Sequence, residues 1–272
     1  MKKHLLIGLS AAALLAASPL ASAHRMWIKP TTTVVSGENE WISFDGAIAN
    51  GIFTPDHYPM PVDRLTATAP SGKTVQLQHQ QRLKYRSVFD LELTEKGTYK
   101  VASASNTLMA RWTDDNGERH MWPGRGKTGT LEEFKQQVPA NADVAQTSRK
   151  IEVFVTAGAP SDSVLKNTGE GLEMVAHTHP NDAYTGEDIT FGFTIDGEKA
   201  VGASVVVVKE GEKYRDNNDD MKLTTDEKGN ITLNVDEPGM YWLEAEYEDN
   251  KAKAPASKRM GTYITTIEVL PL

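Results

Sequence analysis

The chain has 272 residues, a formal net charge of −8 and no cysteine. The lack of cysteine excludes a disulfide framework and thiolate metal ligands, so a metal ion would need His, Asp, Glu, amine or backbone donors. The acidic balance, without any basic stripe, argues against nucleic acid as a partner.

The first 23 residues have the pattern of an export signal. Two basic residues, Lys2 and Lys3, precede an apolar run from Leu5 to Ala17, and the small residues Ala21-Ser22-Ala23 follow it. Small residues in this A-x-A arrangement are what signal peptidase cleaves. The apolar run is shorter than the roughly 20 residues that span a bilayer. We therefore expect removal of residues 1–23 and a periplasmic location.

Cleavage after Ala23 makes His24 the first residue of the mature chain. An N-terminal histidine carries a free α-amine and an imidazole, and the two can chelate one transition-metal ion. Both groups bind metal only when neutral, so affinity should fall below a pH of about 6–7. His24 is the leading candidate ligand, although cleavage could also leave a histidine there without any role.

The first half of the mature chain predicts a series of short strands. Runs rich in β-branched and aromatic residues alternate with turn residues, which favours a sandwich over alternating β/α units. The segment Pro70-Ser71-Gly72-Lys73 predicts a hairpin turn. The predicted strands are Thr31–Val35, Glu40–Phe44, Leu65–Thr68, Thr74–Leu77, Ser87–Leu93, Gly97–Ala102 and Ile151–Thr156.

Residues 103–150 are less strand-like and predict an irregular insertion, which could cover a site or pack as a flap. Within this segment Leu131–Val138 predicts a short helix. Thr130 can act as its N-cap, and Glu132 and Glu133 fall in its first turn.

A second series of strands follows Gly158–Gly171, a stretch of small and polar residues that predicts a linker. Its members are Gly171–Ala176, Asp188–Ile195, Ala203–Lys209, Met221–Thr225, Asn230–Val235, Gly239–Tyr247 and Gly261–Val269.

The two series of strands predict an all-β protein of two immunoglobulin-like or transthyretin-like β-sandwich domains. The first domain is residues 24–157, with the insertion at 103–150. The linker is residues 158–171, and the second domain is residues 172–272.

Two more segments carry candidate metal ligands. His177 and His179 form an H-x-H pair whose side chains would share one face of an extended segment, although a polar strand end explains them as well. His57 lies in the proline-stiffened loop Phe53–Pro59, where Asp56 could orient it or act as a ligand itself. An ordinary exposed loop histidine is the alternative there.

The other histidines and motifs point to no further site. His79 and His120 fit surface positions better than ligand positions. Asp216 to Glu227 partly matches a calcium loop, but Met221 stands where that loop requires glycine. No G-x-S-x-G, H-E-x-x-H or phosphate-binding glycine loop occurs. We therefore predict no catalytic residues.

Six segments carry a family resemblance, and they are Ala23–Trp27, Phe53–Pro59, Lys84–Ser87, Thr178–Asp182, Tyr214–Asp216 and Gly239–Glu244. In them the chain resembles the bacterial periplasmic domain-of-unknown-function family 4198, often described as nickel- or cobalt-uptake components. The resemblance implies a secreted two-domain β protein associated with transition-metal acquisition. It also supports His24, His57 and His179 as ligands.

The leading hypothesis is a periplasmic protein that captures a divalent transition-metal ion, or a small metal chelate, for a membrane transporter. Ligation by nitrogen without sulfur suits copper, nickel and zinc, and the resemblance favours nickel or cobalt and leaves iron open. One alternative is a copper-dependent oxidative enzyme with an N-terminal histidine site. The other is a structural adaptor of the cell envelope.

Overall fold

The computed structural model describes residues 24–37, 39–124, 127–216 and 220–272. The predicted export signal, residues 1–23, lies outside the described residues, and so do residues 217–219 of the segment that partly matches a calcium loop. Among the helices described, none is long and apolar enough to cross a membrane.

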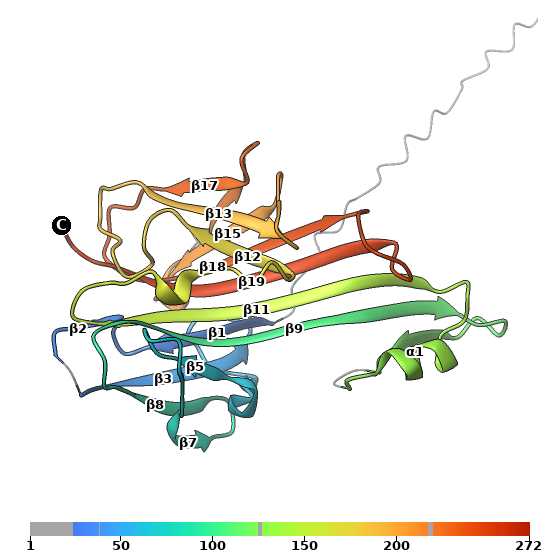
Figure 1. Cartoon of the computed structure of the whole chain (residues 1–272), viewed down its shortest axis with the longest axis horizontal. Helices are drawn as coiled ribbons and strands as arrows, with labels where there is room; N and C mark the ends of the chain where they lie inside the picture. Colours follow the sequence, from blue (N-terminus) through green and yellow to red (C-terminus); the bar gives the residue numbers. More distant parts are fainter. Residues whose placement is uncertain (1–23, 38, 125–126, 217–219) are drawn as a thin grey trace, which may run out of the picture.

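One long sheet runs through the middle of the molecule and contains ten strands of the described chain (Figure 1). The two halves of the sequence meet in it, because β11 and β19 pair in parallel from Ala145 opposite Lys258 to Val153 opposite Thr266. The two predicted domains therefore share a sheet as well as being joined through residues 158–171. The strands, in spatial order, are β16 (Met221–Thr224), β15 (Ser204–Lys209), β18 (Gly239–Asp249), β19 (Lys258–Val269), β11 (Asp143–Ala157), β9 (Gly97–Thr113), β5 (Thr66–Thr68) and β6 (Thr74–Val75), with β10 (Arg119–Trp122) beside β9 and β2 (Val34–Val35) beside β11.

A smaller sheet covers each face of the central sheet, so the molecule is a three-layer, all-β sandwich (Figure 1). One outer sheet comes from the N-terminal half and contains β1 (Arg25–Pro30), β3 (Glu40–Ala49), β8 (Ser87–Leu93), β7 (Gln78–Arg82) and β4 (Tyr58–Pro59). The other comes from the C-terminal half and contains β12 (Leu172–Ala176), β13 (Ile189–Ile195), β14 (Glu198–Lys199) and β17 (Asn230–Leu233). Short 3₁₀ turns lie at Val62–Arg64, Ser163–Leu165 and Glu212–Tyr214.

The central strands feed two hydrophobic cores because successive side chains of a strand point to opposite faces. In β18, Trp242 belongs to the core beneath the N-terminal outer sheet, whereas its neighbours Tyr241 and Leu243 belong to the core beneath the C-terminal one. The Trp242 indole donates a hydrogen bond of 2.8 Å to the Met26 carbonyl of β1. This contact fixes the start of β1 over the central sheet.

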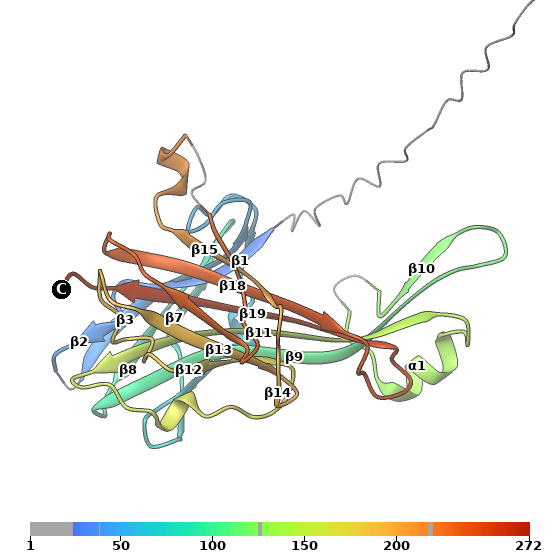
Figure 2. The ribbon, with the colours of Figure 1, turned by 90° about the horizontal axis from the view of Figure 1, so that it is seen from above.

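Strands β9 and β11 run far past both outer sheets and form a projecting arm (Figure 2). The arm carries β10 and α1 (Leu131–Gln137) near its end, with a small core of its own around Trp122 and Phe134. The predicted helix is confirmed. Thr130 is its N-cap, and Glu133 completes a capping box with it.

The strand predictions were right about most positions and wrong about several lengths. The hairpin at 70–73 is confirmed by the pairing of β5 with β6 and by Gly72, whose φ is 82°. Residues 103–150 are more regular than expected, since β9 continues to Thr113 and β11 begins at Asp143. Residues 104–107 of β9 are all exposed, so the sequence there lacks the apolar alternation that reveals a half-buried strand. The strand Arg25–Pro30 was missed altogether.

The segment 158–171 crosses from the end of β11 to the C-terminal outer sheet, and a buried carboxylate fastens it. Glu173 of β12 pairs with Lys150 of β11, and their side chains are only 4% and 10% exposed. The same carboxylate accepts hydrogen bonds from the Thr168 amide and hydroxyl and from the Gly169 amide. Burial alone would raise the Glu173 pKa, but the Lys150 ammonium and these hydrogen bonds outweigh it and lower the pKa.

Candidate metal centre

The structure brings His24 and His57 into direct contact. Their imidazole rings stack with centroids 3.9 Å apart and planes inclined by 14°. His24 lies just before β1 and is exposed, while His57 is half-buried just before β4. The two strands are close because both pair with β3: Arg25 lies opposite Ala49, and Tyr58 lies opposite Ile48.

The loop that carries His57 is held by its own side chains. Both carboxylate oxygens of Asp56 accept hydrogen bonds from Asn50, one from its amide at 2.9 Å and one from its side chain at 3.1 Å. These bonds, from the Asn50 amide first, lower the Asp56 pKa. Phe53 adopts a left-handed φ of 53° and packs edge-on against Trp27 at 5.5 Å. Asp56 therefore closes the loop that carries His57.

A third chain segment, which carries Glu212 and Asp220, contacts residues next to the two histidines. Arg25 forms ion pairs with Glu212 at 3.2 Å and Asp220 at 2.9 Å, and its guanidinium lies over the Trp242 ring. The second carboxylate oxygen of Glu212 accepts a 2.7 Å hydrogen bond from the Ile52 amide. Glu212 thus joins the residue after His24 to the loop that carries His57.

The two imidazoles of this pair offer one nitrogen donor each to an ion. Among the residues that the structure describes, the one cluster of three or more His, Asp or Glu donors close enough for a single ion lies elsewhere. The α-amine that the predicted cleavage after Ala23 would expose on His24 would be a third donor beside these two imidazoles. Two imidazoles and an amine form a donor set that fits a borderline divalent transition metal.

His179 lies in a different place, inside a closed ring of hydrogen bonds. Its Nε2 is 3.1 Å from Thr98 Oγ1, and its Nδ1 accepts the Asn181 amide at 3.0 Å. Thr98 contacts Thr156 at 2.9 Å, and Thr156 donates to the Asn181 side-chain oxygen at 2.9 Å. Each hydroxyl can donate only once, so the His179 proton is on Nε2 and points to Thr98. Both ring nitrogens are therefore occupied.

The H-x-H pair is not brought to His24 and His57. Thr156, in the ring of hydrogen bonds around His179, pairs with Val34 beyond the far end of β1, and β1 alone is about 20 Å long at about 3.3 Å per residue. His177 is exposed and contacts the Asn230 side chain at 3.2 Å. Both histidines line one cavity of about 640 Å³ at that distant end. The sequence does not reveal this because His179 bonds to Thr98, 81 residues away, and Thr98 in turn contacts Thr156, a further strand residue 58 positions from Thr98.

Replacing His179 with alanine should lower the free energy of unfolding by about 1–3 kcal/mol, because it leaves buried partners without hydrogen bonds. Burial lowers the His179 pKa from its ordinary 6.5, against the opposing effects of Ser161, Asp162 and Asp182. Below pH 6.5 His179 is therefore more protonated in the unfolded chain than in the folded chain, so the free energy of unfolding decreases as the pH is lowered. Urea unfolding between pH 5 and 7.5 should show this fall in the parent and less of it in the variant. His177→Ala is the matched control and should behave like the parent.

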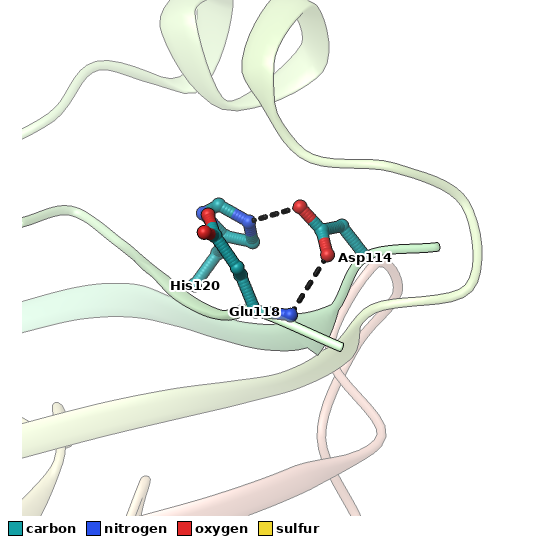
Figure 3. A group of neighbouring side chains, drawn as sticks. All are labelled: Asp114, Glu118 and His120. Atoms are coloured by element: carbon teal, nitrogen blue, oxygen red, sulfur yellow. Dashed lines mark hydrogen bonds and ion pairs between the residues drawn. The ribbon is translucent and has the colours of Figure 1, made fainter. Parts of the chain in front are cut away.

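The cluster of three donors noted above lies at the turn between β9 and β10 and consists of Asp114, Glu118 and His120 (Figure 3). Asp114 accepts hydrogen bonds from the Asn116 and Glu118 amides and lies 3.0 Å from His120 Nε2. These contacts, from His120 first, lower the Asp114 pKa. The carboxylate is the cap of a tight turn, which explains the arrangement without a ligand. His120, predicted to be a surface residue, is half-exposed.

Comparison with solved structures gives low similarity. The chain aligns with Salmonella alpha-2-macroglobulin at 10% identity and a TM-score of 0.22, covering 96% of this chain and 16% of that one. It aligns with the D00-D0 domain of intimin at 12% identity and a TM-score of 0.21, covering 90% and 100%. For the D0-D1 domain of intimin the values are 13% and 0.23, with 89% and 97% covered. A comparison with curated proteins found no match.

A family model does match. The model described as "Domain of unknown function (DUF4198)" aligns with residues 21–249, and that span includes β1, the loop that carries His57, the arm and the THPND segment at 178–182. Because the match covers most of the sequence, the chain belongs to the DUF4198 family.

Proposed function

We propose that this is a periplasmic metal-binding protein that captures a divalent transition-metal ion, free or as a small chelate, for a membrane transporter. The imidazoles of His24 and His57 and the α-amine of His24 are the proposed ligands. The observation that carries the proposal is the stacking of two histidines, 33 residues apart in sequence, at 3.9 Å.

The contacts around the pair favour a binding role over an incidental surface contact. Asp56, Glu212 and Arg25 hold the backbone that carries the two histidines. This fixed backbone lowers the conformational entropy lost when an ion binds. The two stacked rings must still rotate, because the lone pairs of imidazole nitrogens lie in the ring planes and the planes are almost parallel.

The donor set favours some ions over others. Nitrogen ligands bind first-row divalent ions with affinities that rise through cobalt and nickel to copper, so intrinsic affinity alone does not identify the cargo. Nickel and cobalt are the favoured physiological ions because the segments named in the sequence analysis resemble uptake-associated proteins. Copper and zinc suit the same nitrogen ligands, and iron is a further alternative.

Calorimetric titration of the mature chain with Ni²⁺, Co²⁺, Cu²⁺ and Zn²⁺ tests the proposal. The parent should bind at least one ion more tightly than about 10 μM, and His57→Ala should weaken that binding at least tenfold, or about 1.4 kcal/mol. His177→Ala is the matched control, since it removes an exposed imidazole at the other end of the sandwich. Equal affinity in His57→Ala, or no binding to any ion, would refute the proposal and leave an adaptor role.

A further inference from the structure

One edge of the projecting arm has an unfilled place for a strand. On one side β9 pairs with β11 along its whole length. On its other side β5 pairs with residues 100–102 and β10 with residues 110–113. Residues 103–109 between them have no strand partner on that side in the described part of the chain. Seven residues at about 3.3 Å each make a gap of about 23 Å.

The backbone in this gap presents hydrogen-bonding groups outward. The Ala102 carbonyl accepts a hydrogen bond from the Thr66 hydroxyl of β5, and the Thr107 carbonyl accepts one from the Thr147 hydroxyl of β11. The backbone N–H and C=O groups of even-numbered residues therefore point away from β11, and those of odd-numbered residues point toward it. Ala104, Asn106 and Leu108 therefore offer their amides and carbonyls to the gap. Among these outward amides and carbonyls, within the described residues, only the Leu108 carbonyl has a hydrogen-bond partner, which is the Thr107 hydroxyl.

The edge lacks the features that natural proteins use to prevent strand addition. Such edges usually carry a lysine, a proline or a bulge. Residues 103–109 read Ser-Ala-Ser-Asn-Thr-Leu-Met, without charge or proline, and their pairing with β11 continues without a register shift.

A cavity of about 670 Å³ follows this edge. Five consecutive residues, 104–108, line one wall, and Trp122, Lys127, Gly129 and Leu131 contribute to the other. Leu131 is 55% exposed. The wall thus combines apolar side chains with one cation, next to backbone groups that need a partner.

We propose that residues 103–109 of β9 bind a single extended peptide strand of a partner protein by β-strand addition. The residues that line the cavity indicate the chemistry of this peptide. It would carry apolar side chains at alternate positions, to contact Trp122 and Leu131, and a carboxylate to pair with Lys127. Strands β5 and β10 close both ends of the gap, and Leu131 at the start of α1 lies on the opposite wall of the cavity. A single strand therefore fits the gap better than the edge of a second copy. This surface on the arm is separate from the His24–His57 pair and does not depend on it.

The test uses the mature chain and a displayed library of random seven-residue peptides. Enriched peptides are synthesised, and their affinities are measured by fluorescence polarisation. Asn106→Pro removes an outward amide and leaves the β11 pairing intact, so it should weaken binding at least tenfold. Asn106→Ala keeps the amide and should bind like the parent. This matched pair separates recognition of the backbone from recognition of the side chain.

A second measurement covers the case in which Asn106→Pro fails to fold, as judged by circular dichroism. Methylating alternate amides of the selected peptide should also weaken its binding to the parent at least tenfold. The proposal is wrong if no peptide is enriched, or if selected peptides bind the proline variant or the methylated peptides equally well. It is also wrong if sedimentation shows a dimer of the parent that Asn106→Pro dissociates, since a second copy would then fill the gap.

Discussion

Replacing Glu173 with glutamine should lower the free energy of unfolding by about 3–5 kcal/mol, the usual effect of breaking a buried ion pair. The variant keeps the shape of the side chain but leaves the Lys150 ammonium buried without a counter-charge. It also weakens acceptance of hydrogen bonds from Thr168 and Gly169, which fix the segment between the two halves. Urea unfolding at pH 7 measures the loss.

The pH dependence gives a second reading of the same pair. The Glu173 pKa is lowered in the folded protein from an ordinary 4.5. Its contribution to stability is therefore complete above pH 4.5 and is lost as the pH falls through the lower folded value. The glutamine variant should lose less stability than the parent over that acidic range.

Two variants serve as controls for Glu173→Gln. Glu237→Gln breaks an exposed ion pair with Lys209 and should leave unfolding unchanged within error. The double variant Glu173→Gln with Lys150→Met should regain part of the lost stability, because no charge then remains buried. Equal loss in the single and double variants would show that hydrogen bonds, and not charge, hold this junction.

The sequence predicted best what local residues decide. The helix at Leu131–Gln137 was anticipated because Thr130 and Glu133 cap it within four residues. The hairpin at 70–73 was anticipated because Gly72 can take a positive φ. Both features need no information from distant parts of the chain.

Features that depend on distant pairing were harder to predict. Nothing local shows that β11 pairs in parallel with β19 and so joins the two halves in one sheet. The arm was missed because Ser, Thr and Ala along β9 show no apolar alternation. The strand Arg25–Pro30 was not predicted because it directly follows the expected cleavage site and its short sequence shows no clear alternation, although Trp27 and Ile28 are fully buried.

The residues of the candidate site show the same difference between local and distant information. His57 is a candidate from the sequence because prolines and Asp56 mark a rigid loop around it, and in the structure its ring stacks on that of His24. His179 looked equally suited because the H-x-H spacing carries no sign of the partners. The hydroxyls of Thr98 and Thr156 determine its role, and they come from two other strands.

The α-amine of His24 would become a metal donor only through the predicted removal of residues 1–23. In a chain that begins at His24 it is a free amine, whereas acetylation converts it to an amide, which adds no new amine and no longer donates a lone pair to a metal. Loss of one chelating donor should weaken ion binding about 100-fold, or about 2.7 kcal/mol. The stacked rings themselves would be unchanged.

The most direct measurement compares metal affinity, by calorimetry, for the chain beginning at His24 and for the same chain with its α-amine acetylated. The same chain with an amidated carboxyl group at Leu272, an exposed residue, is the matched control. We expect a loss of about 100-fold for the acetylated chain alone. Equal affinity in all three chains would contradict the proposed site.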